Sequence, residues 1–526
     1  MHQSITRHNT TSLSSLQNAQ SPATIIENID VGGPTMLRSA AKNHQFCLSL
    51  PSPAVYEAAL KHIHEMSAGQ HRAQSSLPFR QKMAAKTFSV LSAYDTDIAR
   101  WMNSQTQNEA AAEALPDVTS RSYRIQHPLK YGNNPHQTPA AVAMDQSPGV
   151  SAQLPYQIVN GSPGYINLLD ALNAWQLVRE LSDAASRFTG KSIPAAASFK
   201  HVSPAGAALG LPLTADMIET YAVSDTQAAN MTPLAAAYLR ARQCDPLCSF
   251  GDFVAVSHVV DEQTALVLKS EVSDGIIAPG FTEEAKAILS KKKKGAYIML
   301  AMDATYEPTD IEWREVFGVA MAQRRNSVAV DADSLTRSPV CGGDPTEDQV
   351  LDMLVASITV KYTQSNSIGF AKGGQMVGVG AGQQSRVDCV KLAGRKVATW
   401  HMRFHPKVRS LRFKSSVKKQ DRVNARVRYI EGDMAATEKQ AWLQLFETPP
   451  APLTPQEKQE YMATLRGVSL SSDAFFPFRD GIDAAARFGV DCIAQPGGSV
   501  GDTAVQSAAQ EYDMRMVHTG MRLFHH

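Results

Sequence analysis

Several features are scarce or missing in this sequence of 526 residues, and each absence excludes a class of protein. No run reaches about 18 consecutive apolar residues, and residues 1–20 lack the apolar core of a secretory signal, so we expect a cytosolic protein without membrane partners. Lys and Arg (51) balance Asp and Glu (50), so no overall charge draws the chain to nucleic acid or to an anionic membrane. Any anion-binding site must therefore be local.

Cysteine is also scarce, with six residues and one close pair, Cys244 and Cys248. Neither disulfides nor structural zinc are expected from this pattern. A zinc-dependent nucleobase deaminase needs His-x-Glu and Pro-Cys-x-x-Cys, but here His201 is followed by Val202-Ser203 and no Pro-Cys-x-x-Cys occurs. We therefore assign no metal ligand and expect no metal in the chemistry.

Composition divides the chain into three parts. Residues 1–22 are polar, acid-free and without periodicity, which predicts a disordered tail; the similarity to a transit peptide is loose because Arg7 is its only Arg. Residues 23–120 read as structured, with a helix from Pro78 whose buried face is expected to hold Phe88, Leu91, Tyr94, Ile98 and Trp101. Residues 102–120 lose this pattern and predict a linker, so the main region should span 121–526.

Strands and helices alternate in that main region. Residues 166–181 show a helical stripe of Leu168, Leu172, Trp175 and Val178, and residues 195–199 read as a buried strand that stops at 200–206. Another strand begins near 251, and residues 367–379 predict a hairpin with a Gly-Gly turn, followed by a helix from about 382. This alternation predicts an α/β fold, with ligands at strand ends and helix N-termini. Segments 190–290 and 350–400 suggest an internal duplication.

Two short segments contain residues that are suited to catalysis or to anion binding. Lys200-His201 joins a fixed cation to a side chain that transfers protons near neutral pH, although such a pair is commonly a surface Lys and a structural His. Residues 380–386, Gly-Ala-Gly-Gln-Gln-Ser-Arg, can present backbone N–H groups and Arg386 to an anion at a helix start. A plain glycine-rich turn is the alternative, and no Walker loop is present.

Residues 391–420 contain no acid and interleave basic side chains with Trp400, Phe404 and Phe413. That pattern is found in proteins that bind single-stranded nucleic acid. The neutral total favours a solvated basic face or a channel for a small polyanion. Residues 291–294, four consecutive Lys, are expected to form a solvated loop.

Eight segments in order closely resemble the family of AICAR transformylases, which is usually fused to IMP cyclohydrolase. They are KYGNNPHQ (130–137), SFKHVSPAG (198–206), SFGDF (249–253), EVSDGIIAPG (271–280), VKYTQSNS (360–367), GAGQQSR (380–386), SSDAFFPFRD (471–480) and RLFHH (522–526). The resemblance is continuous from about 122 to 526. It favours functional roles for Lys200-His201 and for 380–386 over the alternatives of a surface Lys with a structural His and of a plain glycine-rich turn.

The resemblance implies formyl transfer from 10-formyltetrahydrofolate to the 5-amine of AICAR, giving formyl-AICAR in purine biosynthesis. The conjugated amine is a poor nucleophile, so the attack needs proton removal and charge stabilisation. By similarity His201 accepts the proton, and Lys200 stabilises the oxyanion or protonates the leaving folate nitrogen. A catalytically silent nucleotide-binding protein is the alternative, against which the presence of both residues speaks.

Similarity also assigns the contacts and the architecture. The nucleotide contacts are Lys130, Tyr131, Gly251, Asn366, Arg386, Phe475 and Arg522. The folate contacts are Asp274, Val387, Asp480, Ser499 and Val500. Lys130 stands where the family usually has Arg, which keeps the charge but loses the planar fork. The family fold implies two cytidine-deaminase-like α/β units without zinc, in a homodimer whose sites form across the interface.

The segment IDVGGPTMLRSAAKNH (29–44) resembles the second half of the cyclohydrolase domain. Asp30 and Val31 fall at a nucleotide-contact position and Lys42 at a proton-transfer position, with an ordinary Gly turn before a helix as the alternative. Because the family's upstream strands and phosphate loops are missing, we expect a remnant of a Rossmann-like domain with little or no cyclohydrolase activity. A bifunctional enzyme that still cyclises formyl-AICAR to IMP is the other possibility.

Overall fold

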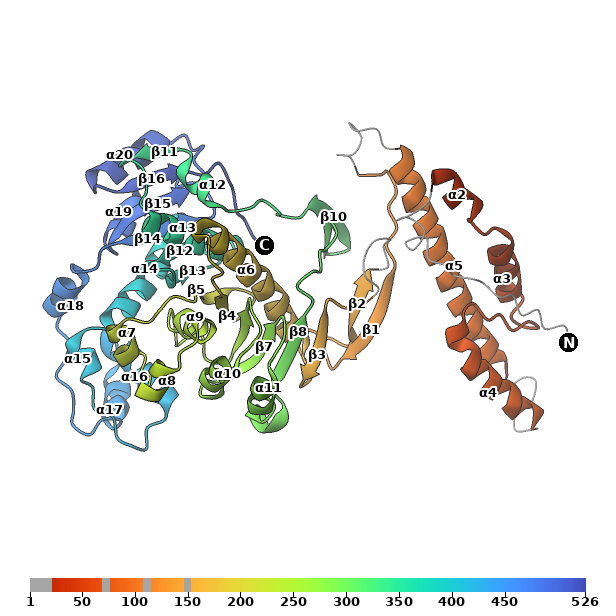
Figure 1. Ribbon diagram of the computed structural model, residues 1–526, viewed down its shortest axis with the longest axis horizontal. Coiled ribbons are helices and arrows are strands. Elements are labelled where there is room, and N and C mark those ends of the chain that lie inside the picture. The colour runs from red at the N-terminus through yellow and green to blue at the C-terminus, as the bar shows by residue number, and fades with distance from the viewer. Residues whose placement is uncertain (1–20, 69–75, 107–114, 146–152) are drawn as a thin grey trace. The chain divides into compact units, whose positions relative to one another are not determined.

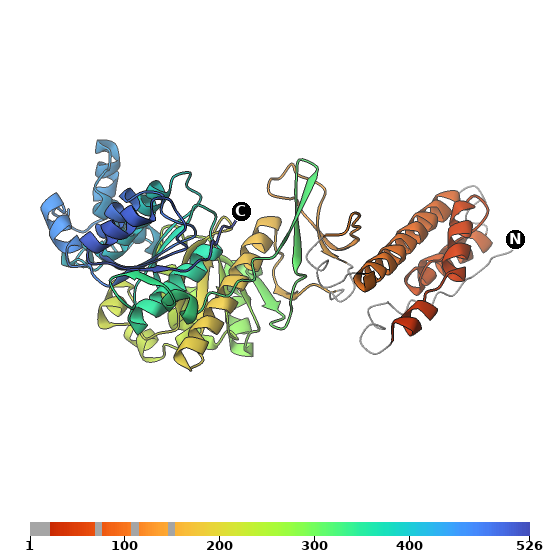
Figure 2. The same ribbon diagram turned by 90° about the horizontal axis from the view of Figure 1, so that it is seen from above.

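The computed structural model describes residues 21–68, 76–106, 115–145 and 153–526, and every structural statement below refers to these ranges (Figures 1 and 2). The chain divides into an N-terminal unit, residues 1–128 and 141–154, and a C-terminal unit, residues 129–140 and 155–526. Each unit is described by itself. The predicted disordered tail falls almost entirely on residues 1–20, outside the described ranges. In the described residues no helix is both long and apolar enough to cross a membrane.

The N-terminal unit is mostly helical. Its elements are α2 (Pro22–Glu27), α3 (Gly32–Lys42), the 3₁₀ helix η1 (Pro53–Val55), α4 (Tyr56–Ser67), α5 (Leu77–Thr106) and a two-stranded sheet of β1 (Tyr123–Leu129) and β2 (Ala140–Asp145). Residues 21–68 and 76–106 contain no strand, so the expected Rossmann-like remnant gains no support. Helix α5 continues through the first five residues of the predicted linker, 102–106.

The predicted buried face of α5 is wrong at one position. Leu91 and Trp101 are buried as expected, but Phe88 is 44% exposed. The buried face runs instead through Met83, Thr87 and Leu91. These residues are four apart and share one side of the helix, whereas Phe88 is rotated by about 100° from Thr87.

Two six-stranded mixed sheets form the C-terminal unit and confirm the predicted α/β class. The first sheet has the order β3-β8-β7-β6-β4-β5 and the second has the order β11-β16-β15-β14-β12-β13. The strands are β3 (Tyr156–Asn160), β4 (Ala195–Phe199), β5 (Pro204–Leu209), β6 (Asp252–Val256), β7 (Ser273–Ala278), β8 (Ile298–Met302), β11 (Pro339–Cys341), β12 (Ile368–Ala371), β13 (Met376–Gly380), β14 (Val468–Ser472), β15 (Val490–Gln495) and β16 (Arg515–His518). A separate hairpin pairs β9 (Ile311–Val316) with β10 (Val319–Arg324).

The helices of this unit all lie between β3 and β16 in the chain (Figure 1). They are α6 (Tyr165–Thr189), α7 (Ala215–Thr220), α8 (Asp225–Ala229), α9 (Pro233–Arg242), α10 (Glu262–Lys269), α11 (Glu283–Leu289), the 3₁₀ turn η4 (Lys292–Gly295), α12 (Ala332–Thr336), α13 (Glu347–Lys361), α14 (Arg386–Met402), α15 (Pro406–Arg409), α16 (Lys419–Glu431), α17 (Ala436–Leu443), α18 (Pro455–Met462), α19 (Asp480–Ala486) and α20 (Asp502–Glu511).

The two sheets have the same topology. In each, an antiparallel hairpin (β4-β5 or β12-β13) lies beside three mutually parallel strands (β6-β7-β8 or β14-β15-β16), and an antiparallel edge strand (β3 or β11) completes the sheet. One helix precedes each hairpin (α6 or α13). The first hairpin is followed by the short helices α7 and α8 and then by α9, and the second hairpin is followed by α14. This equivalence supports an internal repeat, over about 156–302 and 339–518, which is longer than the segments suggested by the sequence.

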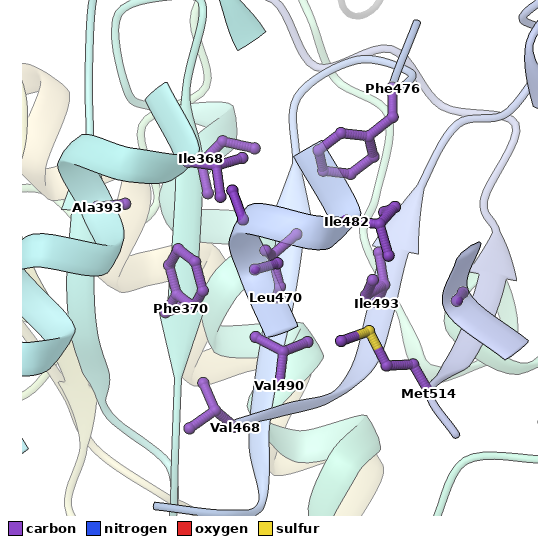
Figure 3. Close-up of a cluster of buried hydrophobic side chains, with 14 of the residues drawn as sticks. Ile368, Phe370, Ala393, Val468, Leu470, Phe476, Ile482, Val490, Ile493 and Met514 are labelled. Atoms are coloured by element: carbon purple, nitrogen blue, oxygen red, sulfur yellow. The ribbon is translucent and has the colours of Figure 1, made fainter. Parts of the chain in front are cut away.

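Alternating side chains build a core on one face of each sheet. In the second sheet, Ile368, Phe370, Leu470 and Ile493 pack with residues of α14, α19 and α20 (Figure 3). The first sheet packs in the same way with α9, α10 and α11. Helices α6 and α13 contact the strands and each other.

Helices α15–α18 are inserted between α14 and β14 and have a core of their own. This insertion explains why the sequence showed the second repeat only to about residue 400. The aromatic residues of the basic segment 391–420 belong to these cores, since Trp400 is 5% and Phe413 is 9% exposed. Arg403 is also buried and donates to Gln243. Trp400 and Phe413 are therefore not available to stack on nucleic-acid bases, and the segment is not a uniformly solvated face.

Candidate active site

The Lys200-His201 pair lies in the tight turn between β4 and β5. The backbone N–H of Lys200 donates to the Ser203 carbonyl at 3.0 Å, and His201 and Val202 both have φ of 59°. A positive φ is uncommon for residues other than Gly and is a genuine outlier for β-branched Val. The predicted end of the strand is confirmed. Pro204 and Gly206, which were expected to end the strand, instead belong to the next strand, β5.

Strand pairing carries other predicted residues to this turn. Phe199 pairs with Phe253 and Asp252 pairs with Ser273, so Lys200, Gly251 and Asp274 gather at the amino ends of β6 and β7. The ammonium of Lys200 donates to the Phe250 carbonyl at 2.6 Å. Gly251 has φ of 77°, a conformation that suits Gly and permits the sharp entry into β6.

A buried charge cluster supports this edge. Arg242 is 2% exposed and donates to Asp252 at 2.9 Å, to Glu271 at 3.0 Å and to the Ser249 carbonyl at 2.7 Å. Asp252 also accepts from Ser198 Oγ at 2.8 Å. Burial raises the pKa of Asp252, while Arg242 opposes that shift. The cluster holds the first residue of β6 beside the turn, and sequence reasoning missed it although Asp252 stands inside the SFGDF segment.

The four-Lys segment 291–294 is not simply a solvated loop. Lys293 pairs with Asp274 at 2.5 Å, so this predicted folate contact already has a cationic partner. The Lys292 ammonium is buried and lies 4.4 Å from the centre of the Tyr297 ring. Burial lowers the pKa of Lys292 to about 8. The prediction of a solvated run is therefore wrong for Lys292.

A second group of predicted residues gathers at the carboxyl edge of the second sheet. Ser385 caps α14, so the helix begins at Arg386, four residues later than predicted. Arg386 is 8% exposed; its guanidinium forms an ion pair with buried Asp473 and donates to Asn366 Oδ1 at 2.7 Å. Asp473 also accepts from Ser365 Oγ at 2.6 Å. Arg386 thus braces the loop that carries Asn366 and does not stand open toward solvent.

Three loops from parallel strands complete this edge. The C-terminal segment is anchored by Leu523 N–H, which donates to the Asp473 carbonyl at 2.8 Å, and this places Arg522 beside the loop after β14. The loops after β14 and β15 approach each other closely, because a Cβ on Gly501 would lie 2.5 Å from the Pro477 carbonyl oxygen. The remaining predicted residues of these loops and of α14 are Val387, Phe475, Asp480, Ser499 and Val500, with Phe475 at 42% and Val500 at 108% exposure.

The two groups meet within the C-terminal unit. Edge strands β5 and β13 approach in antiparallel fashion, with a bridge between Ala208 and Gln375. At the other end of this edge, Gln364 N–H lies 3.5 Å from Ser203 Oγ. The catalytic candidates of the first sheet and the Asn366 loop of the second sheet therefore face the same region.

The other predicted residues follow β1 or belong to the N-terminal unit. Lys130 and Tyr131 follow β1, with the Lys130 ammonium 5.9 Å from the Tyr131 ring centre, and no hydrogen bond joins them to either loop in the described part of the chain. Asp30 Oδ1 accepts from Gly33 N–H at 2.9 Å and thereby caps α3, which Val31 precedes. Lys42 is exposed at the last position of α3.

Comparison with known proteins identifies the family of this chain. Two related α/β repeats, joined at their edges and carrying a Lys-His turn, define a paired-sheet protein with one shared loop region. Residues 40–396 match the family model described as AICARFT/IMPCHase bienzyme, and the chain belongs to this family. The resemblance found in the sequence is thereby confirmed.

Relatives cover nearly the whole chain. The bifunctional purine biosynthesis protein PurH of Dinoroseobacter shibae is 33% identical over 508 residues, which is 96% of this chain and 77% of the relative. The protein of the same name from Brucella abortus is 31% identical over 504 residues, covering 96% and 76%.

Proposed function

We propose that this chain catalyses folate-dependent formyl transfer from 10-formyltetrahydrofolate to the 5-amine of AICAR, giving formyl-AICAR in purine biosynthesis. The single observation that carries the proposal is the Lys200-His201 turn, which is held in a left-handed conformation and faces the Asn366 loop. Residues held in such strained backbone conformations cluster at active sites.

The reaction forms a bond between the amine nitrogen and the formyl carbon, breaks the bond from that carbon to N10 of the folate, and moves one proton from the amine to N10. His201 is exposed, and in this proposal its imidazole is the general base that takes the proton. Lys200 lies next to it and supplies a positive charge for the developing oxyanion.

The surrounding residues fit the two substrates chemically. The exposed ring of Phe475 is available to the nucleotide, and the exposed side chain of Val500 is available to the flat heterocycle of the folate. Asp480 and Asp274 can accept hydrogen bonds from the amino groups of the folate. The proposal assigns Asn366, whose side chain accepts a hydrogen bond from Arg386, to the nucleotide. Binding at Asp274 requires the ligand to share or displace Lys293. Assembly of the full site across a homodimer is part of the proposal.

The test uses the purified full chain with 10-formyltetrahydrofolate and AICAR, following release of tetrahydrofolate and of formyl-AICAR. His201→Ala is expected to lose at least about 100-fold in turnover, since a positioned general base contributes roughly 10² to 10⁴, while AICAR binding changes little. Lys200→Met should also lower turnover. His64→Ala, an exposed His on α4, is the matched control. Near-normal turnover of His201→Ala would contradict the assignment.

Cyclisation of formyl-AICAR is a weaker candidate for this chain. Asp30 serves as a helix cap and Lys42 is exposed, so the described geometry does not assemble these residues into a site. The proposal is therefore confined to formyl transfer. Supplying purified formyl-AICAR and following IMP tests this limit, and formation of IMP at a rate comparable to formyl transfer would overturn it.

A further inference from the structure

The internal repeat contains two versions of the same hairpin turn. Lys200 N–H donates to the Ser203 carbonyl at 3.0 Å, and Lys372 N–H donates to the Gln375 carbonyl at 2.9 Å. The two central residues have positive φ in both turns, at 59° and 59° in the first and at 61° and 76° in the second. The second turn uses Gly373-Gly374, whereas the first uses His201-Val202 in a conformation that favours glycine.

Each turn is held by one carboxylate from the preceding helix. Asp170 is the sixth residue of α6, and its Oδ1 accepts from Val202 N–H at 2.7 Å. Asp352 is the sixth residue of α13 and accepts from Gly373 N–H at 2.9 Å and Gly374 N–H at 2.6 Å. The residues are 6% and 4% exposed. The same interaction, between a helix carboxylate and backbone N–H groups of the turn, therefore stabilises a glycine turn in one repeat and a strained turn in the other.

The His201 ring depends on this backbone arrangement. The ring is exposed, and among the described residues no side chain donates to it or accepts from it. Its direction is therefore set by the φ and ψ of the turn and by its own rotamer. Loss of the bond to Val202 would leave two residues free to return to ordinary backbone conformations.

We propose that Asp170 is a positioning residue for the formyl-transfer reaction, which holds the His201-Val202 turn in its left-handed conformation and thereby aims the imidazole. The inference rests on the proposed function. The charged groups that face Asp170 are His201, Asp252 and Asp274, of which Asp252 pairs with Arg242 and Asp274 pairs with Lys293. The bond to Val202 N–H requires only an acceptor, so an uncharged isostere should preserve it.

Substitutions at Asp170 distinguish a role in orienting His201 from a role in stability alone. Asp170→Ala should lower kcat at least tenfold, with KM for AICAR within threefold of the wild type. Asp170→Asn, which keeps the acceptor, should stay within threefold in kcat. Adding Val202→Gly to Asp170→Ala should raise kcat at least threefold above that of Asp170→Ala alone, because glycine adopts the turn without strain. If Asp170→Ala does not fold, Asp170→Ser takes its place, with the same expected loss and the same restoration.

Asp352→Ala is the matched control, since it removes the equivalent carboxylate from a turn without site residues. It should lower the unfolding midpoint at least as much as Asp170→Ala and leave kcat within threefold. Unchanged kcat in Asp170→Ala overturns the proposal, as do equal losses in the Ala and Asn variants without restoration by Val202→Gly, or an equal loss in Asp352→Ala.

A second measurement is independent of catalysis. Hydrogen exchange of the Val202 amide should be at least tenfold faster in Asp170→Ala than in the wild type and close to the wild type in Asp170→Asn. If the wild type shows no formyl transfer, the proposed function fails while this measurement still tests the turn. If the wild type is active and Val202 exchange does not change, the positioning role fails by itself.

Discussion

Replacing His201 with Gly should make the protein more stable and nearly inactive. The equivalent turn position in the other repeat is Gly373, with φ of 61° against 59° for His201. A non-glycine residue in the left-handed region costs of order 1–3 kcal/mol. Gly costs about 0.4–1 kcal/mol through the greater entropy of the unfolded chain. Because the His201 side chain is exposed, little burial is lost, and the net gain should be about 1 kcal/mol.

The assay pairs urea unfolding, followed by tryptophan fluorescence, with turnover in formyl transfer. His201→Gly should raise the midpoint while turnover falls at least about 100-fold. The matched control is Gly373→Ala, where a Cβ would have no neighbour within 4 Å, so its expected loss of about 1 kcal/mol measures backbone strain alone. Destabilisation by His201→Gly, or a neutral Gly373→Ala, would refute the strain argument.

Four further predictions concern charge, pH, metals and assembly. Arg386→Ala leaves Asp473 buried without its partner and should cost about 3–5 kcal/mol of unfolding free energy in urea, whereas a change below about 1 kcal/mol would show that the pair matters little. Burial raises the pKa of Asp352 to about 6 in the folded state, so its contribution to stability is present below about pH 4 and is lost as the pH rises through 6. Between pH 5 and pH 7 the wild type should therefore lose about 1 kcal/mol relative to Asp352→Asn; an opposite slope would contradict this sign. Formyl transfer should survive a strong divalent-metal chelator, and loss of activity that zinc restores would show that the site was misread. Sedimentation at micromolar concentration should give about twice the chain mass of 57.0 kDa, and an active, strictly monomeric species would refute a site shared between subunits.

Much of the local structure could be predicted from the sequence. Strand β4 reads as five buried residues ending at Phe199, and the hairpin β12-β13 is indicated by Gly373-Gly374. These features depend on neighbours within a few residues, where side-chain periodicity and turn chemistry decide the conformation. The predictions were wrong where tertiary packing decides whether a side chain is buried. Phe88 on α5 was expected to be buried but is exposed, and the Lys292 ammonium was expected to be solvated but is buried.

The residue types of the Lys-His pair, the order of the motifs and, through these motifs, the family could be read from the sequence alone. The tertiary structure was needed to show that Ser203 meets Gln364, that Arg386 pairs with Asp473 and donates to Asn366, and that Asp170 accepts from Val202 N–H. The reason is physical, since these contacts join residues 20 to 161 positions apart. Their partners are selected by sheet pairing and helix packing, which no local pattern encodes.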